Sequence, residues 1–531
     1  MDNLSTSEAV ARAVRPPFAA TIWELLAAGV AAEPQRVVLI VDGAPLTMQD
    51  LAIRAMAAAT AITGAGVPPG GRVLTMLGNG IDHIALFLGA ALAGAVFVPV
   101  NPDLRGPSLA HVLAKTAPDT AFVTADAAAR LAETGCAVAP DRIVTCERWG
   151  DRFATSTDTE RRQHRDWPLP GQNAAPDDLR AFLFTSGTTG PPKGVMVTER
   201  MLLASAAGTA LASDCKNGDI FLMWEPIHHI GGCQIAVMAL MHAVALVLVE
   251  RFSASRLWDT VRRHGITKLH YLGGVLEILL KAEPKPDDRD HPVKLAFGGG
   301  CRPQVWRAFQ QRFDIPIREV YGMTEASSFT TVNVDGVVGS VGTPVPWFDV
   351  ALLDADATPV ADGQVGEIVV ESCHPGLFTP GYLDEPEATA RLLQGGRLHS
   401  GDSARREADG HYWFLGRLSD SLRRRGENIS AWEVETALAA HPQIAETAVT
   451  GVDAEIGEQE ILCFVLMRAG ATFNAAALSH WARANLPPHH VPRYWKHVET
   501  FERTPSQRIL KNRLDRSLDD AFDAAPARER A

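Results

Sequence analysis

The stretch Thr185-Ser-Gly-Thr-Thr-Gly190-Pro-Pro-Lys193-Gly194 decides how the rest of the chain is interpreted. Its glycines let backbone N–H groups turn towards an anion, its hydroxyls add donors, and its lysine supplies a point charge. The apolar run from Leu179 to Phe184 predicts a strand that holds the loop in place. We therefore interpret the stretch as a phosphate-binding loop, with an ordinary surface loop rich in Gly, Ser and Thr as the alternative.

The loop differs from a Walker-type phosphate loop in the residues after the lysine. In a Walker loop the next residue is Ser or Thr and a helix begins at once, whereas here Gly194 comes next and Val195 to Val197 predicts a second strand. Two prolines before the lysine also oppose a helix. A Ser/Thr/Gly-rich loop ending in Pro-Lys-Gly is instead similar to the signature of the adenylate-forming (ANL) superfamily, which comprises acyl-CoA synthetases, peptide-synthetase adenylation domains and firefly-type luciferases.

Composition limits the class of protein. With 531 residues, of which 46% are hydrophobic, the chain can form several domains, and its net charge of −12 gives no general attraction to nucleic acid or an anionic membrane. Seven scattered cysteines show no zinc or disulfide spacing, Met1 to Arg15 lacks the apolar core of a secretion signal, and no apolar run reaches the ~20 residues of a membrane span. We expect a cytoplasmic protein without a membrane span.

Periodicity predicts an α/β fold. Short β-rich runs alternate with helical periodicity from Thr21 to Val123, which favours βαβ units and a largely parallel sheet. Ile84 to Val100 and Ile235 to Val249 each predict a buried helix followed by a strand, and Ala125 to Asp178 predicts irregular connecting structure. The resemblance implies a large N-terminal domain, residues 1–418, and a small mobile α+β C-terminal domain, residues 419–531, with a hinge near Ser419.

The resemblance also assigns ligands and roles. It implies a small-molecule carboxylic acid, ATP or an acyl-AMP, Mg²⁺ and coenzyme A. It implies that Lys193 and the phosphate-binding loop hold the phosphates, and that the Gly-rich turn after Phe297 lies against the adenine. It also implies that His229, in the motif Pro226-Ile-His-His229, acts as a gate beside the acyl carboxylate. In Tyr321-Gly-Met-Thr-Glu325, the ring stacks on adenine, the threonine meets the phosphate and the glutamate binds magnesium. The implied nucleotide-binding residues are Thr185, Ser186, Gly187, Thr188, Thr189, Gly190, Gly299, Gly300, Tyr321, Gly322 and Thr324.

Later motifs continue the family pattern in order. Asp402 is expected to accept bonds from the ribose hydroxyls, and Arg417 to contact the ribose. The segment Arg423-Arg-Arg-Gly426-Glu-Asn-Ile-Ser430 most resembles crotonobetaine/carnitine-CoA ligase-like acid:CoA ligases, in which Gly426 would let the pantetheine arm of CoA pass close to the backbone. The implied reaction is acid plus MgATP giving acyl-AMP, followed by transfer of the acyl group to CoA.

One departure concerns the tail Thr504-Pro-Ser-Gln507-Arg508-Ile-Leu-Lys511. The family has glycine and a catalytic lysine where this chain has Gln507 and Arg508. An arginine fork is broader than an ammonium, and loss of one positioned electrostatic group typically costs about 10²–10³ in rate. We expect the thioester-forming step to be intact and adenylation to be weakened or absent, so that a partner adenylating ligase would supply the acyl-AMP. Tolerance of Arg508, or Lys511 in its place, is the alternative.

The sequence leaves open which acid is the substrate and which molecule accepts the acyl group. The segments Ile230 to Cys233, Tyr271 to Gly274 and Ala296 to Cys301 are rich in small residues without an obvious charge, which favours a roomy pocket for a bulky apolar acid. A free-standing enzyme that loads a carrier protein would share the N-terminal motifs; its amino-acid version needs an acidic residue near the first of these segments, and Asp214 and Asp219 lie nearby. A luciferase-like oxygenase and a silent adenylate-binding protein are further alternatives.

Overall fold

The computed structural model describes residues 19–135, 138–145, 152–153, 173–185, 192–418, 421–424, 427–453, 459–486, 488–503 and 509–524. The chain splits into two compact units. The first is Met1–Asp349 with Val370–Leu398, and the second is Val350–Val369 with His399–Ala531. The expected hinge residue Ser419 lies outside the described residues, so the boundary between residues 418 and 419 stays a prediction.

A six-stranded sheet in the first unit carries the phosphate-loop hairpin. In spatial order its strands are β6 (Ile143–Thr145), β5 (Thr120–Val123), β3 (Arg72–Met76), β4 (Val96–Pro99), β7 (Leu179–Thr185) and β8 (Lys193–Thr198). All neighbours pair in parallel except β7 and β8, the two strands expected on both sides of the loop, which form an antiparallel hairpin. Its helices are α3 (Met48–Gly64), α4 (Ile81–Leu92), α5 (Gly106–Thr116) and α6 (Ala125–Glu133).

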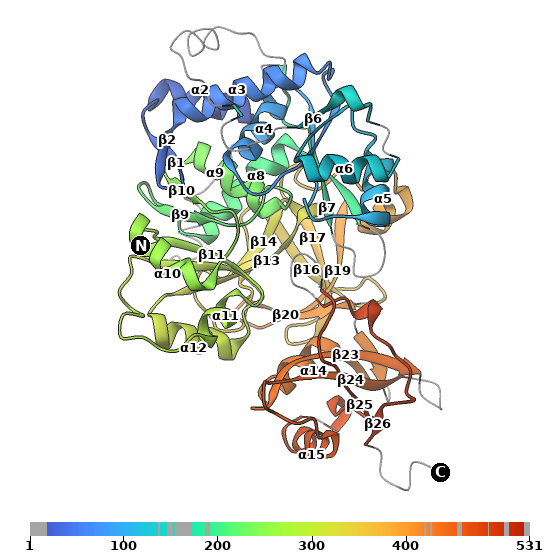
Figure 1. The fold of residues 1–531 in the computed structure, drawn as a ribbon. Coiled ribbons are helices and arrows are strands. Elements are labelled where there is room, and N and C mark those ends of the chain that lie inside the picture. Colours follow the sequence, from blue (N-terminus) through green and yellow to red (C-terminus); the bar gives the residue numbers. More distant parts are fainter. Residues whose placement is uncertain are drawn as a thin grey trace. The chain divides into compact units, whose positions relative to one another are not determined.

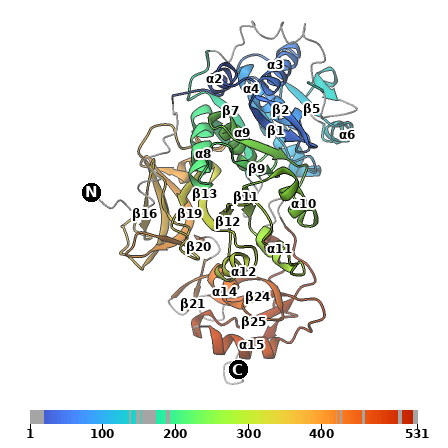
Figure 2. The same ribbon diagram turned by 90° about the vertical axis from the view of Figure 1, so that its left-hand side faces the viewer.

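Helices α3 and α4 lie side by side (Figures 1 and 2). Their close approach depends on Gly89, where a Cβ atom would lie 2.7 Å from the Cβ of Ala58 and 2.9 Å from the carbonyl oxygen of Ala55. Every residue of α4 is buried. The apolar run from Ile84 to Val100 is therefore a buried helix followed by a buried strand, as predicted, and none of the described helices is long and apolar enough to cross a membrane.

The interpretation of Ala125 to Asp178 as irregular was wrong at its start. Helix α6 begins there, because the side chain of Thr124 caps it by accepting from the backbone N–H of Ala127. Arg130 is buried along the helix and pairs with Asp126 one turn earlier at 3.0 Å. This ion pair stabilises a short helix, and strand β6 follows it.

A nine-stranded sheet completes the first unit. In spatial order its strands are β15 (Thr343–Pro344), β14 (Ser328–Val332), β13 (Ile317–Met323), β12 (Leu295–Gly299), β11 (Lys268–Leu272), β9 (Ile220–Met223), β10 (Ala245–Leu248), β1 (Val37–Val41) and β2 (Ala44–Thr47). From β13 to β1 all neighbours are parallel. The helices are α2 (Ile22–Ala32), α8 (Glu199–Ala212), α9 (Ile230–Met241), α10 (Ala254–His264), α11 (Val275–Lys281) and α12 (Pro303–Phe313). Strands and helices alternate from β9 to β13, and the same alternation from β3 to β5 confirms the βαβ organisation expected between Thr21 and Val123.

The second unit ends in a small α+β body. Its four-stranded sheet has the order β23 (Ile444–Asp453), β24 (Gln459–Met467), β25 (Tyr494–His497) and β26 (Phe522–Asp523), with α14 (Ala431–Leu438) and α15 (Ala475–Asn485) beside it. Val434 and Leu438 on α14 share one core with Trp495 on β25. The remaining elements of both units are β16 (Phe348–Leu353), β17 (Val365–Ser372), α13 (Pro386–Leu392), β18 (Leu393–Gln394), β19 (Arg397–Arg406), β20 (Tyr412–Arg417), β21 (Ser421–Arg424) and β22 (Glu427–Ser430).

Candidate functional site

The hairpin of β7 and β8 positions the two ends of the phosphate loop. Thr185 and Lys193 are the last paired residues of the two strands, directly opposite one another. The loop between them must therefore begin and end at neighbouring points of the sheet. Ser186, Gly187, Thr188, Thr189 and Gly190 lie outside the described residues, and their expected role stays a prediction.

Lys193, Tyr382 and Glu325 come together from three separate segments. The Nζ atom of Lys193 lies 5.0 Å from the centre of the Tyr382 ring, within the range of a cation–π contact. The Tyr382 hydroxyl donates to Oε1 of Glu325 at 2.7 Å, and that glutamate is only 6% exposed. Sequence reasoning gave Tyr382 no role and missed its position between the lysine and the glutamate.

Glu325 fits the role of a magnesium ligand. Tyr382 and the backbone N–H of Thr379, which donates to the Glu325 carbonyl oxygen at 2.8 Å, fix the residue in place. Among the described residues, no group of three or more His, Cys, Asp or Glu side chains could hold a metal by itself. One fixed carboxylate is nevertheless typical of Mg²⁺ sites that share the ion with phosphate oxygens and water.

The Gly-rich turn after β12 is held by a buried carboxyl group. Glu319 on β13 accepts hydrogen bonds from the Tyr271 hydroxyl at 2.5 Å and from the backbone N–H groups of Gly300 at 2.5 Å and Cys301 at 2.9 Å. Burial raises the pKa of Glu319 to about 7, against the opposing effect of these three bonds. Gly298 must be glycine, because a Cβ atom there would lie 1.8 Å from the Tyr271 carbonyl oxygen. Glu319 therefore fixes the turn that contains Gly299 and Gly300.

The Tyr-Gly-Met-Thr-Glu motif spans the end of β13 and the subsequent 3-10 turn, Thr324–Ala326. Tyr321 is buried and pairs across the sheet with Thr331. Gly322 allows β14 to approach closely, since a Cβ atom would lie 1.7 Å from the carbonyl oxygen of Ser328. The motif therefore needs glycine for packing as well as for any nucleotide. Thr324 begins the turn that places Glu325 beside Tyr382.

His229 lies immediately before helix α9. Its backbone carbonyl accepts from the N–H of Cys233, and its ring lies 4.5 Å from that of His228 between centroids. Burial, followed by the charges of His229 and His83, lowers the pKa of His228 well below its ordinary value. At neutral pH His228 is therefore uncharged.

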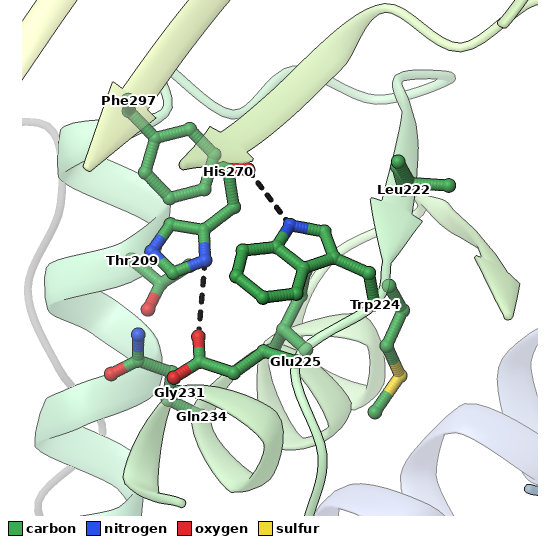
Figure 3. A pocket seen from close by; sticks show the side chains of 10 residues that line it. Thr209, Leu222, Trp224, Glu225, Gly231, Gln234, His270 and Phe297 are labelled. Atoms are coloured by element: carbon green, nitrogen blue, oxygen red, sulfur yellow. Dashed lines mark hydrogen bonds and ion pairs between the residues drawn. The ribbon is translucent and has the colours of Figure 1, made fainter. Parts of the chain in front are cut away.

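A small cavity lies behind the first turn of α9 (Figure 3). It is lined by the end of β9, by α9 and by the buried strands β11 and β12. Its wall includes Glu225 and His270, which form an ion pair of 3.0 Å. The sequence suggested a roomy pocket without charge, but these two residues flank the small-residue segments and contribute ionisable groups, of which His270 is charged only when protonated. Asp214 and Asp219 do not line the cavity; Asp214 pairs with Lys216, and Asp219 with Lys268 and Lys294.

In the second unit, Asp402 on β19 lies opposite Arg417 on β20. The Nε atom of Arg417 lies 2.9 Å from Oδ1 of Asp402, and its Nη1 donates to the carbonyl oxygen of Ser400 at 3.2 Å. The antiparallel register thus brings together the two residues expected to hold a ribose. Their shared register supports a common role, which stays a prediction.

Gly426 and Arg508 lie outside the described residues, but the chain on both sides of Arg508 is anchored. Arg503 and Ile509 form an antiparallel bridge, and the N–H of Leu510 donates to the carbonyl oxygen of Glu502 at 2.9 Å. Lys511 lies 2.8 Å from Oε1 of Glu435. Since this contact holds Lys511 within its own unit, the lysine is a poor replacement for the residue at position 508.

Comparison with known proteins identifies the family. The model of the AMP-binding enzymes matches residues 26–383, and that of the AMP-binding enzyme C-terminal domain matches residues 433–508. The chain is 30% identical to a sulfoacetate–CoA ligase of Cupriavidus necator, covering 93% of this chain and 97% of the relative. It is 28% identical to a crotonobetaine/carnitine–CoA ligase of Salmonella arizonae, over 85% of this chain and 89% of the relative.

A solved structure shows the same fold. The anthranilate–CoA ligase AuaEII, in complex with anthranoyl-AMP, superposes with a TM-score of 0.82 at 19% identity, over 94% of this chain and 97% of the other. The expected α/β architecture is thereby confirmed. With both family models matched in order along one chain, the protein belongs to the AMP-binding enzymes of the adenylate-forming superfamily.

Proposed function

We propose that the protein is an AMP-forming acid–CoA ligase that makes an acyl-CoA thioester by way of an acyl-adenylate. The carrying observation is the cluster of Lys193, Tyr382 and Glu325 at the end of the loop hairpin. It combines a cation and a fixed carboxylate beside a loop rich in N–H and hydroxyl donors, which suits the binding of a nucleotide triphosphate with its magnesium ion.

In this proposal the candidate site residues bind different parts of the substrates. Lys193 and the loop from Thr185 to Gly190 orient the phosphates, and Glu325 holds Mg²⁺, which neutralises phosphate charge when bound. Glu319 keeps the Gly299–Gly300 turn in shape for the adenine, while Asp402 and Arg417 bind the ribose. His229 borders the acyl carboxylate.

We further propose that the two half-reactions are unequal. Arg508 takes the place of the lysine on which acyl-adenylate formation depends in the family, and Lys511 is engaged by Glu435. Transfer of the acyl group to CoA does not depend on this residue. The protein therefore completes thioesters from an acyl-adenylate, which a partner adenylating ligase would supply. A complete ligase in which Arg508 is tolerated is the competing proposal.

The acid is better described as polar than as bulky and apolar. The sequence favoured a bulky apolar acid, but the cavity behind α9 is small and contains Glu225 and His270. The names of two relatives, a sulfoacetate and a crotonobetaine/carnitine ligase, also support a polar acid.

The proposal is tested with purified protein, a panel of synthetic acyl-adenylates and CoA, with acyl-CoA and AMP measured by mass spectrometry. We expect thioester from at least one member of the panel. Glu325→Gln keeps an acceptor for Tyr382 but loses the carboxylate charge, so in the Arg508→Lys background, where adenylation is expected to be restored, it should lower MgATP-dependent acyl-AMP formation far more than thioester formation from acyl-AMP. A protein that binds the adenylates and never transfers them to CoA would be a silent binding protein, and the proposal would fail.

A further inference from the structure

The cavity behind α9 has room for one small group. Its volume is about 10 Å³, close to the minimum for one water molecule. Its lining includes Trp224, Glu225, Gly231, Gln234, His270 and Phe297. Gly231 belongs to the first turn of α9, two residues after His229. The cavity therefore lies at the first turn of the helix that directly follows His229, the residue expected to gate the acyl carboxylate.

The polar wall of the cavity is rigid. Figure 3 shows the ring of His270 beside the Trp224 indole, with the Glu225 carboxylate next to both. The indole stacks on His270 with centroids 6.1 Å apart, and its Nε1 donates to the His270 carbonyl oxygen at 2.8 Å. The Phe297 ring lies 5.1 Å from the His270 ring. His270 is thus held between two aromatic rings.

Glu225 is an ionised group in this wall. It is only 8% exposed, and burial by itself would raise its pKa. The charge and hydrogen bond of His270, with the charge of His229, outweigh that effect and lower the pKa of Glu225. The carboxylate lies directly against Gly231, where a Cβ atom would be 1.9 Å from Oε2. Glycine at position 231 therefore makes room for a buried carboxylate.

Two polar atoms of the cavity lack partners. Within the described part of the chain, Oε1 of Gln234 and Nε2 of His270 are buried without a hydrogen bond, and the two side chains are 2% and 8% exposed. An unpartnered buried polar atom is costly and is normally satisfied by water or a ligand. These two atoms and the Glu225 carboxylate line a space that is large enough for one group of the size of a water molecule.

The chemistry of the wall selects among possible groups. Glu225 and the Gln234 oxygen accept hydrogen bonds, whereas Nε2 of His270 accepts when the ring is neutral and donates when it is charged. A hydroxyl group both donates and accepts, so it can donate to Glu225 or Gln234 while it accepts from the charged His270 ring; beside the neutral ring it satisfies one of the three acceptors. An ammonium group can only donate, and a carboxylate or sulfonate would be repelled by Glu225.

We propose that this cavity binds a hydroxyl group of the acid substrate, so that the enzyme selects hydroxylated carboxylic acids over their deoxy counterparts. The inference rests on the proposed ligase function and names the substrate class of the same site. Glu225 and Gln234 are then the residues that determine specificity. Loss of one hydrogen bond to a charged group predicts about a 10- to 100-fold lower kcat/KM for the deoxy acid.

The test uses matched sets of straight-chain and arylpropanoic acids, each as parent, terminal hydroxy, terminal amino and terminal carboxy compound. Their acyl-adenylates are assayed with CoA for kcat/KM, and their non-hydrolysable acyl-sulfamoyl adenosines are ranked by thermal shift. Gln234→Leu removes the free acceptor at similar size, Glu225→Gln removes the charge at constant shape, and Gln311→Leu at an exposed position of α12 is the matched control.

We expect the hydroxy compound to rank first by both readouts, with the preference reduced about 10-fold in both cavity variants and unchanged in the control. Equal rates for hydroxy and parent compounds, or a preference for the amino or carboxy compound, would overturn the inference. If thioester forms without a hydroxyl preference, the ligase function stands and the inference fails. If no thioester forms but the thermal shifts still favour the hydroxy analogue, the ligase function fails and the hydroxyl site stands.

Discussion

Replacing Glu319 with glutamine should remove a pH dependence of stability that the native carboxyl group creates. Burial raises the pKa of Glu319 from 4.5 to about 7. At about 1.4 kcal/mol per pKa unit, this rise corresponds to about 3 kcal/mol. The folded chain binds the proton more tightly than the unfolded chain. The contribution is therefore fully present below pH 4.5 and is lost as the pH rises from 4.5 to about 7.

Glutamine has the same shape and never ionises. Its carbonyl oxygen can still accept from Gly300 or Cys301, so the turn should keep its structure. The free energy of unfolding of the wild type relative to Glu319→Gln should thus fall by about 3 kcal/mol between pH 4.5 and pH 8.

The assay is urea denaturation of both proteins at closely spaced pH values, followed by tryptophan fluorescence. Only the difference between the proteins is interpreted, because other groups titrate equally in both. A difference that stays constant over this range, or grows with pH, would refute the argument that a buried, largely protonated carboxyl group supports the Gly298–Gly300 turn.

Three other substitutions test other parts of the first unit. Burial lowers the pKa of His83 from 6.5 to about 4. The contribution of the neutral ring to the free energy of unfolding is therefore present above pH 6.5 and is lost as the pH falls towards 4. In the same denaturation series, His83→Gln should abolish this loss of about 3 kcal/mol. Gly231→Ala places a Cβ atom 1.9 Å from Oε2 of Glu225 and should cost about 1–3 kcal/mol and displace the carboxylate, measured by thermal unfolding. Gly64→Ala, where the added Cβ atom meets nothing within 4 Å, should instead raise stability by about 0.5–1 kcal/mol. Equal effects of the two alanine substitutions would contradict the packing argument.

The sequence predicted the elements whose signals are local. The hairpin on both sides of the phosphate loop follows from two apolar runs and an interruption by glycine and proline. The N-cap of α8 has a signal of the same local kind, since the side chain of Thr198 accepts from the N–H of Met201 three residues later. Helix α6 was missed, although Asp126 and Arg130 are spaced one helical turn apart and form an ion pair along it.

The cavity could not be predicted in the same way, because its wall is assembled by tertiary packing. Glu225 follows β9 and His270 lies on β11, so 45 positions of sequence separate an ion pair that the parallel sheet brings together. A signal was present, since a polar side chain on a buried parallel strand is costly without a partner. That signal marks His270 as unusual without naming Glu225 as its partner.

The bridging position of Tyr382 has a similar origin. Its contact with Lys193 and its hydrogen bond to Glu325 join segments that are far apart in the chain, so no local pattern predicts them. Only the folded arrangement shows that the lysine and the glutamate share one neighbour. Motif order predicted which residues matter, while the sheets determined which of them meet.

The most direct test of the account is ATP–pyrophosphate exchange in the wild type and in Arg508→Lys, each compared with thioester formation from synthetic acyl-AMP. We predict that the wild type forms thioester from acyl-AMP with little exchange, and that Arg508→Lys raises exchange by about 10²–10³ while changing thioester formation little. Vigorous exchange in the wild type, with no gain from lysine, would show that Arg508 is tolerated and that the enzyme is a complete ligase.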